Sequence, residues 1–202
     1  MQKDSLDEFE LQVGHSAPAW SATAYQKGKE FRTVSSADYA GKWVVLFFYP
    51  RNFTFVCPTE LKAFAASCEE FREVNAQLVA VSTDSEWSHK AWFEKDMPDV
   101  QYPVLADTTH EIAWNYNVLV EKTGEALRGT FIIDPEGVLR YSVVSDLNVG
   151  RSVDETLRVL RALQTGGLCP ANWKQGEATL QPGAVEQSQP EKEPAFNVKP
   201  TF

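Results

Sequence analysis

The chain has 202 residues, 43% of them hydrophobic and 12% aromatic, which suits one compact domain with a sizeable core and short appendages. Its formal net charge of −9 argues against nucleic acid as a partner, because binding phosphates requires clustered lysine and arginine. Residues 1–4 contain no apolar run, so we expect no signal peptide and no membrane span. Three cysteines in such a chain indicate a reducing cytoplasm.

The first half of the chain predicts strands joined by short turns and one long helix. Residues 20–25 and 30–34 flank a Gln-Lys-Gly-Lys turn and form a predicted hairpin. An apolar run at 44–49, a helical pattern at 58–75 and a second apolar run at 77–82 predict a β-α-β unit. Such a unit favours a parallel pair of strands.

The second half predicts two shorter helices and another hairpin. The helices are expected at 85–95 and 109–115. Asp134-Pro135-Glu136-Gly137 is a strong turn signal between strands at 131–134 and 138–144. A β-α-β unit followed by a hairpin and a helix predicts a layered α/β fold.

The last predicted helix, 152–164, carries signals at both ends. Ser152 is placed as the N-cap, Glu155 is expected to complete a capping box, and Gly166 follows the end of the helix. After Leu180 the composition shifts to proline, glutamine and glutamate with few apolar residues, so we predict a flexible tail at 181–202.

The segment around Cys57 is the most informative part of the sequence. A predicted core strand ends in a Pro-Arg-Asn turn, and the helical pattern begins just after Cys57. Pro58 suits the first helical turn, where the free N–H groups and the positive end of the helix dipole favour an anion such as a thiolate. Thr54 could place a hydroxyl beside the sulfur or beside a bound polar substrate, and Glu60 in the first turn could orient an arginine. The alternative is a small buried hydrophobic cysteine, which this strand–turn–helix setting disfavours.

The other potential ligands give no sign of a metal site. Cys68 follows the spacing of an inward stripe with Leu61, Phe64 and Phe71, and is predicted to fill the core. No Cys-x-x-Cys motif occurs. The three histidines stand alone and are expected at the surface or in hydrogen bonds, at positions His15, His89 and His110.

Four blocks of sequence resemble a known family. Pro50-x-x-x-Thr54-x-x-Cys57 resembles the active-site motif of peroxiredoxins, and residues 53–60 are similar to the typical two-cysteine subfamily, especially bacterial alkyl hydroperoxide reductases of the peroxiredoxin type. Residues 127–134, 150–155 and 167–173 are similar too, the last to the resolving-cysteine segment. The match runs from Val13 to Leu180.

The resemblance implies an α/β, thioredoxin-like fold with an N-terminal hairpin extension and a C-terminal arm. Residues 1–164 would form the peroxiredoxin domain, 165–180 the arm with the resolving cysteine, and 181–202 the tail. It implies a thiol peroxidase that needs no cofactor and no metal. Cys57 would attack the hydroperoxide and become a sulfenic acid.

It also implies roles for the neighbouring residues. Thr54 would hydrogen-bond the peroxide, Pro50 would shield the sulfenate from water, and Arg128 would hold the thiolate and the polarised O–O bond. Glu60 and Arg151 match a supporting pair that orients Arg128 or organises the edge of the site.

Cys169 would resolve the sulfenic acid through a disulfide with Cys57 of a partner subunit. The implied assembly is a homodimer or a decamer made of five dimers. The implied electron donor is thioredoxin, a dedicated flavoprotein disulfide reductase or a small dithiol adaptor.

Two departures from the family pattern and three other possible functions bear on this interpretation. Met97–Val104 lacks a Gly-Gly-Leu-Gly insertion and the tail lacks a Tyr-Phe pair, which predicts resistance to over-oxidation; the stretch from Gln164 to Cys169 is also short. Glu60 stands where a thioredoxin-like dithiol enzyme would need its second cysteine. A ring-forming holdase chaperone or a thioredoxin-like binding module remains as the alternative.

Overall fold

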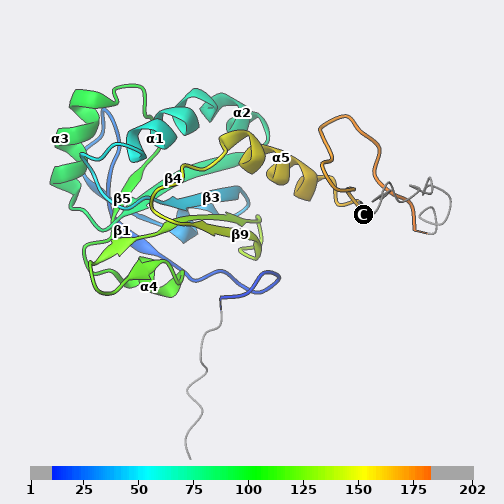
Figure 1. Ribbon diagram of the computed structural model, residues 1–202, viewed down its shortest axis with the longest axis horizontal. Helices are drawn as coiled ribbons and strands as arrows, with labels where there is room; N and C mark the ends of the chain where they lie inside the picture. Colours follow the sequence, from blue (N-terminus) through cyan, green and yellow to red (C-terminus); the bar gives the residue numbers. More distant parts are fainter. Residues whose placement is uncertain (1–10, 183–202) are drawn as a thin grey trace, which may run out of the picture.

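A seven-stranded mixed sheet forms the centre of the molecule (Figure 1). The computed structural model describes residues 11–182. In spatial order the strands are β2 (Arg32–Ser35), β1 (Ser21–Tyr25), β5 (Val104–Ala106), β4 (Ala76–Ser82), β3 (Trp43–Phe48), β8 (Arg128–Ile133) and β9 (Leu139–Ser145). The helices are η1 (Ser36–Tyr39, a 3-10 turn), α1 (Cys57–Ala66), α2 (Cys68–Glu73), α3 (Glu86–Asp96), α4 (Glu111–Asn115) and α5 (Val153–Gln164). A small second sheet pairs β6 (Leu119–Val120) with β7 (Glu125–Ala126).

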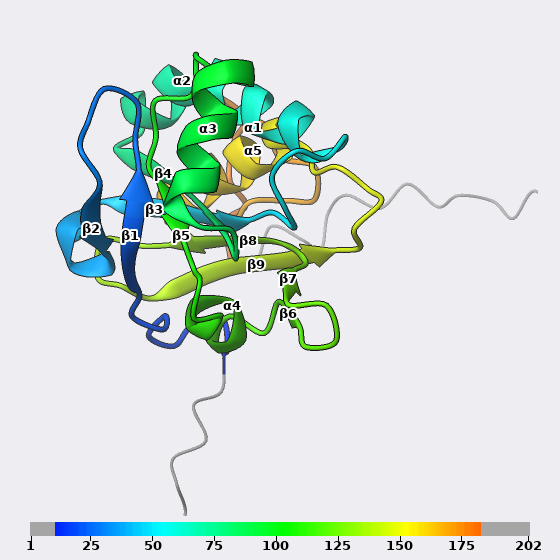
Figure 2. The same cartoon turned by 90° about the vertical axis from the view of Figure 1, so that its left-hand side faces the viewer.

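The helices cover the two faces of the sheet unequally. Helices α1, α2, α3 and α5 lie on one face, whereas α4 and the β6–β7 hairpin lie on the other (Figure 2). Strand β3 is therefore buried on both faces: Val45 and Phe47 join the core under α1, and Leu46 and Phe48 join the core beside α4. This double burial explains why its sequence is continuously apolar rather than alternating.

The predicted strand pairings are confirmed. Strands β1 and β2 form the antiparallel hairpin, β3 and β4 pair in parallel, and β8 and β9 form the second hairpin around the turn at 134–137. Strand β5 was not predicted, and it completes the sheet by pairing in parallel with β4 and antiparallel with β1. Because it has only three residues, its sequence carries little strand signal.

The helix predicted at 58–75 and the capping box predicted at Ser152 were both wrong in detail. The helix expected at 58–75 is broken at Ser67, whose ψ of 6° interrupts the regular path between α1 and α2. Serine is a weak helix former, and the break leaves both Cys68 and Phe71 buried in the core. The predicted core role of Cys68 is thus confirmed.

Helix α5 begins as predicted but without a full capping box. Ser152 Oγ accepts a hydrogen bond from Glu155 N at 3.1 Å, which confirms the N-cap. The Glu155 carboxylate does not return to the Ser152 backbone, because it accepts two hydrogen bonds from Arg158 at 2.6 and 2.8 Å. A charged guanidinium fork competes well against one backbone N–H for this carboxylate.

Beyond α5 the chain forms an arm without regular helix or strand up to residue 182. Most of the tail predicted at 181–202 lies outside the described residues. Among residues 11–182, no helix is long and apolar enough to cross a membrane.

Candidate active site

The thiol of Cys57 lies at the start of α1, just beyond the end of β3. Tyr49 and Pro50 continue the buried strand, and a turn at 51–56 then leads into the helix, with Pro58 in its first turn. Cys57 is the first residue of α1, as the strand–turn–helix pattern predicted, and its side chain is fully buried.

Arg128 brings a positive charge to this thiol. It is the first residue of β8, next to β3 in the sheet, and its side chain is almost completely buried. Its Nη1 lies 3.4 Å from Cys57 Sγ, while its Nε donates to the carbonyl of Leu147 at 2.8 Å. The guanidinium is therefore fixed between the sulfur and the loop after β9.

Glu60 joins Arg128 to a second arginine. Its Oε2 accepts from Arg128 Nη1 at 2.6 Å and from Arg151 Nη2 at 3.0 Å, and its Oε1 accepts from Nε and from the backbone N of Arg151, both at 2.8 Å. Arg151 also donates to the carbonyl of Gly129 at 2.8 Å. Glu60 is thus saturated with donors from two sides.

The charges of this cluster favour an anion beside it. Burial alone would raise the pKa of Glu60, but the hydrogen bonds and charge of Arg151, together with Arg128, outweigh burial and lower that pKa. Glu60 is therefore ionised, and two guanidinium groups with one carboxylate leave one excess positive charge. Opposite charge within a few ångströms stabilises a thiolate over a thiol.

Thr54 and Pro50 lie close to Cys57 along the chain, but the structure gives them no direct bond to the sulfur. The hydroxyl of Thr54 donates to the carbonyl of Arg51 at 3.0 Å and is half-buried. Pro50 is buried at the end of the strand. Both residues therefore remain predicted site residues. Thr54 lies in the turn that leads to Cys57, and Pro50 immediately precedes that turn.

Cys169 is not brought to Cys57 within one chain. Its Sγ lies 3.3 Å from Thr165 Oγ1 and 3.6 Å from the carbonyl of Ala162, at the end of α5. All three cysteines are free thiols, and Cys169 is half-buried. The segment after α5 runs away from the body of the molecule (Figure 1).

A buried polar network behind the turn was not expected from the sequence. The hydroxyl of Tyr49 donates to Asn52 Oδ1 at 2.8 Å and lies 3.2 Å from His89 Nδ1, while Asn52 Nδ2 donates to Ser88 Oγ at 2.8 Å. His89 Nε2 donates to the carbonyl of Leu105 at 3.1 Å. The network fastens the turn after β3 to α3. The sequence indicates this network only through Tyr49, whose hydroxyl is the one polar group at the end of an apolar run.

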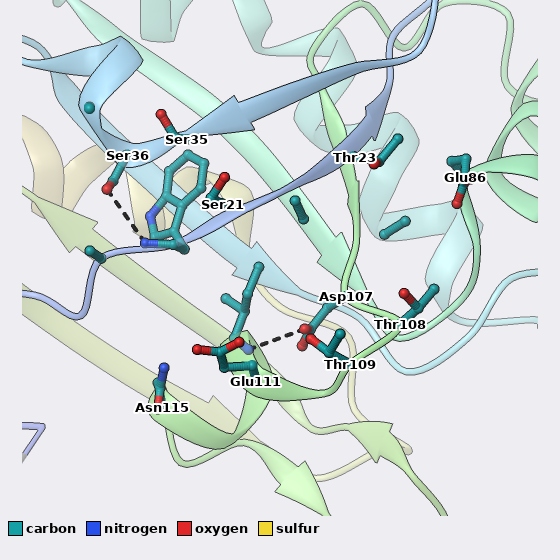
Figure 3. Close-up of a pocket in the computed structure, with 16 residues that line it drawn as sticks. Ser21, Thr23, Ser35, Ser36, Glu86, Asp107, Thr108, Thr109, Glu111 and Asn115 are labelled. Atoms are coloured by element: carbon teal, nitrogen blue, oxygen red, sulfur yellow. Dashed lines mark hydrogen bonds between the residues drawn. The ribbon is translucent and has the colours of Figure 1, made fainter.

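A cavity of about 680 Å³ lies away from this thiol, between the start of β1 and the segment before α4 (Figure 3). Asp107 is its most buried acid, but both carboxylate oxygens accept backbone N–H groups, from Ile112 at 3.1 Å and Ala113 at 2.7 Å. These bonds make Asp107 a structural cap for α4. The cavity contains none of the predicted site residues.

Comparison with known proteins assigns the chain to a family. The AhpC/TSA family profile matches residues 13–142. A protein from Clostridium pasteurianum, named as a peroxiredoxin of the rubredoxin operon, is 50% identical over 178 residues, which are 85% of this chain and 100% of that protein. The structure of reduced Plasmodium vivax 2-Cys peroxiredoxin matches with a TM-score of 0.81 at 37% identity, covering 84% of this chain and 93% of that chain.

A second solved structure agrees. Enterococcus faecalis AhpC matches with a TM-score of 0.75 at 36% identity, covering 78% of this chain and 98% of that chain. These similarities confirm the thioredoxin-like α/β fold and the resemblance drawn from the motifs around Cys57 and Cys169. The chain belongs to the AhpC/TSA family of peroxiredoxins.

Proposed function

We propose that this peroxiredoxin reduces hydrogen peroxide and organic hydroperoxides through the thiolate of Cys57. The observation that carries this proposal is the 3.4 Å contact between Arg128 Nη1 and Cys57 Sγ inside a cluster of net positive charge. The sulfur electron pair forms an S–O bond with one peroxide oxygen while the O–O bond breaks. The leaving hydroxide or alkoxide takes a proton, giving water or an alcohol and a sulfenic acid on Cys57.

The residues of the turn and of β8 would serve this step. Arg128 would stabilise the thiolate and then the negative charge that develops on the leaving oxygen. Thr54 can turn its hydroxyl from the carbonyl of Arg51 toward a bound peroxide. Pro50, buried at the end of the strand that leads to the Cys57 turn, would keep water from the sulfenate.

Glu60 and Arg151 act one step further from the sulfur. Glu60 accepts hydrogen bonds from both arginines and so fixes the direction in which Arg128 points. Arg151 reaches the same carboxylate with three donors and also holds the carbonyl of Gly129 at the start of β8. Both residues therefore position Arg128.

We further propose that Cys169 of a partner subunit resolves the sulfenic acid. Two observations support this step. Cys57 is buried, and the thiol of Cys169 in the same chain contacts Thr165 at the end of α5, on an arm that runs away from the body of the molecule. Strand β9 forms an edge of the sheet with Val143 and Val144 exposed, which suits a contact with a second copy. The assembly would be a homodimer, or a decamer of five dimers.

The same proposal covers the electron donor, the location and the division of the chain. A dithiol protein, thioredoxin or a flavoprotein disulfide reductase, would return the disulfide to two thiols by exchange, in the cytoplasm and without a bound cofactor. Residues 1–164 would be the peroxidase domain and 165–180 the resolving arm.

Subunit mixing tests resolution across the dimer. A mixture of tagged Cys57→Ser chains and untagged Cys169→Ser chains is treated with one equivalent of hydrogen peroxide, and its disulfides are mapped by mass spectrometry. The proposal predicts a covalent heterodimer joined between Cys57 and Cys169. A wild-type disulfide found within single chains, or no such peptide in the mixture, would contradict it.

A holdase chaperone is the second candidate, favoured by exposed aromatic residues around the active-site turn. Phe53 and Phe55 are 59% and 92% exposed, and Trp87 on nearby α3 is 64% exposed. An apolar surface of this kind can bind unfolded chains. Suppression of aggregation by the Cys57→Ser variant, with no peroxidase activity in the wild type, would favour this function.

A further inference from the structure

The arm that carries Cys169 is a closed loop with its own internal bonds. Leu168 and Leu180 meet in an antiparallel bridge, and Leu180 N donates to the carbonyl of Leu168 at 2.7 Å. Inside the loop, the buried Trp173 donates from Nε1 to the carbonyl of Glu177 at 2.9 Å and from its backbone N to Pro170 at 3.1 Å. The position of Cys169 therefore depends on where this loop is attached to the rest of the molecule.

The loop contacts α5 through Cys169 itself and, at its other side, through Arg158. Nη1 of Arg158 donates to the carbonyl of Trp173 at 3.0 Å. Nε and Nη2 of Arg158 donate to the two carboxylate oxygens of Glu155 on the same helix, at 2.6 and 2.8 Å. A planar guanidinium held by a bidentate pair has little freedom left, so the third bond fixes the loop at a defined place on the helix.

Arg158 and Cys169 also share one surface groove. It has a volume of about 480 Å³, and its floor comes from α5 while its wall comes from the loop residues around Cys169 and Asn172. Hydrogen bonding to Glu155 raises the pKa of Arg158, and negative charge on Glu155 and on an ionised Cys169 acts in the same direction. Because Glu155 already balances the guanidinium charge, the effect of Arg158 on Cys169 comes from position more than from charge.

We propose that Arg158 is the positioning residue for the second step of the reaction, holding the arm so that the Cys169 thiol faces the sulfenic acid of the partner subunit. This inference rests on the proposed role of Cys169. In that step the Cys169 thiolate forms the S–S bond with the Cys57 sulfur and the S–O bond breaks. Cys169 is oxidised, the Cys57 sulfur is reduced, and the leaving hydroxide takes a proton to become water.

The chain provides a matched control one turn along the same helix. Arg161 pairs with Glu70 at 3.1 Å and is similarly covered, with 22% of its side chain exposed against 29% for Arg158. It bonds to α2 rather than to the loop that holds Cys169. Arg161→Gln thus removes an ion pair of similar exposure from α5 without releasing the arm.

The test separates the two steps by rapid mixing of the full-length, pre-reduced protein with hydrogen peroxide. Sulfenic acid is trapped with dimedone at each time point, and the disulfide is followed by quenching. We expect Arg158→Gln and Arg158→Lys to form sulfenic acid at the wild-type rate and to form the disulfide about tenfold more slowly, because small misplacements of a reacting group are costly. Arg161→Gln should match the wild type in both steps.

Each other result overturns the inference. Disulfide formation at the wild-type rate in Arg158→Gln would remove the positioning role, and full rescue by Arg158→Lys would show that charge alone matters. Slowing of both steps with a lower unfolding midpoint would indicate a structural residue only. A Cys169→Ser chain run in parallel must lose the disulfide; if it does not, the role of Cys169 itself fails, whatever Arg158 does.

Discussion

Arg128 and Glu60 form an ion pair in the interior, directly beside the thiol of Cys57. Their side chains are 3% and 2% exposed, and Nη1 of Arg128 divides its contacts between Glu60 Oε2 at 2.6 Å and Cys57 Sγ at 3.4 Å. A carboxylate so close to a thiolate would repel it if Arg151 did not also pair with Glu60. The second arginine thus leaves Arg128 free to act on the sulfur.

Removing the charge of Glu60 should damage both stability and chemistry. Glu60→Gln leaves two buried guanidinium groups without their counter-ion, and breaking a buried pair costs about 3–5 kcal/mol of unfolding free energy. Displacement of Arg128 should slow sulfenic acid formation by up to about 100-fold. Urea unfolding and rapid mixing with peroxide measure the two effects.

An exposed pair on the same side of the molecule serves as the control for Glu60. Glu69 pairs with Arg72 on α2, and more than half of each side chain is exposed. Glu69→Gln should therefore cost less than about 1 kcal/mol and leave the peroxide step unchanged. Equal effects of the two substitutions would mean that the buried cluster has no special role.

The hydroxyl of Thr54 should matter only for the peroxide step. The hydroxyl donates to the carbonyl of Arg51 at 3.0 Å, and in the proposed mechanism it would donate to the peroxide instead. Thr54→Val should slow sulfenic acid formation by about 100-fold, the usual effect of losing a donor to a developing negative charge, and Thr54→Ser should keep most of the rate. If valine and serine variants react equally fast, the hydroxyl is not used.

Acid should weaken the fold through His89. Burial lowers the pKa of His89 to about 4, whereas a histidine in the unfolded chain titrates near about 6.5. Between these values the unfolded chain binds a proton that the folded chain does not, so stability falls as the pH drops through this window. At about 1.4 kcal/mol per pH unit the loss amounts to about 3 kcal/mol at pH 4.

The pH dependence of urea unfolding tests the contribution of His89. The slope between pH 6.5 and pH 4 in the wild type should be reduced by His89→Gln, although this variant starts from a lower stability at pH 7. His15 is exposed, so His15→Gln should leave the slope as it is. An unchanged slope in His89→Gln would assign the acid sensitivity to other groups, such as Glu60.

Over-oxidation of Cys57 should need a large excess of peroxide. In the proposed cycle the sulfenic acid would either react with Cys169 or react with a second peroxide to give sulfinic acid, which is mostly irreversible. The chain lacks both sequence features of the easily inactivated members, so the wild type should show no sulfinic Cys57 by mass spectrometry at modest peroxide, while Cys169→Ser should accumulate it. Sulfinic Cys57 in the wild type under those conditions would contradict the prediction.

Local sequence was enough to predict the position of the thiol. The apolar strand, the turn and Pro58 all lie within a few residues of Cys57, and each acts through short-range geometry. Arg128 and Arg151 both contact Glu60 across about 70 to 90 residues of chain. Local sequence cannot predict such contacts, so only the family resemblance linked these residues before the structure was known.

Other features escaped prediction for different physical reasons. His89 looked isolated because its partners, Tyr49 and Asn52, come from a distant turn. The break at Ser67 reflects packing of α2 on the sheet, which overrides a helical pattern. The partner of Cys169 could not be read from one chain, because the proposed contact lies between two.

The rate of hydrogen peroxide consumption by the pre-reduced protein tests the central claim most directly. Stopped-flow measurements on the wild type, Cys57→Ser and Cys68→Ser separate the thiol at the start of α1 from the core cysteine. The account predicts fast consumption by the wild type and by Cys68→Ser, and none above background by Cys57→Ser. Slow consumption by the wild type that does not change when Cys57 is replaced would contradict it.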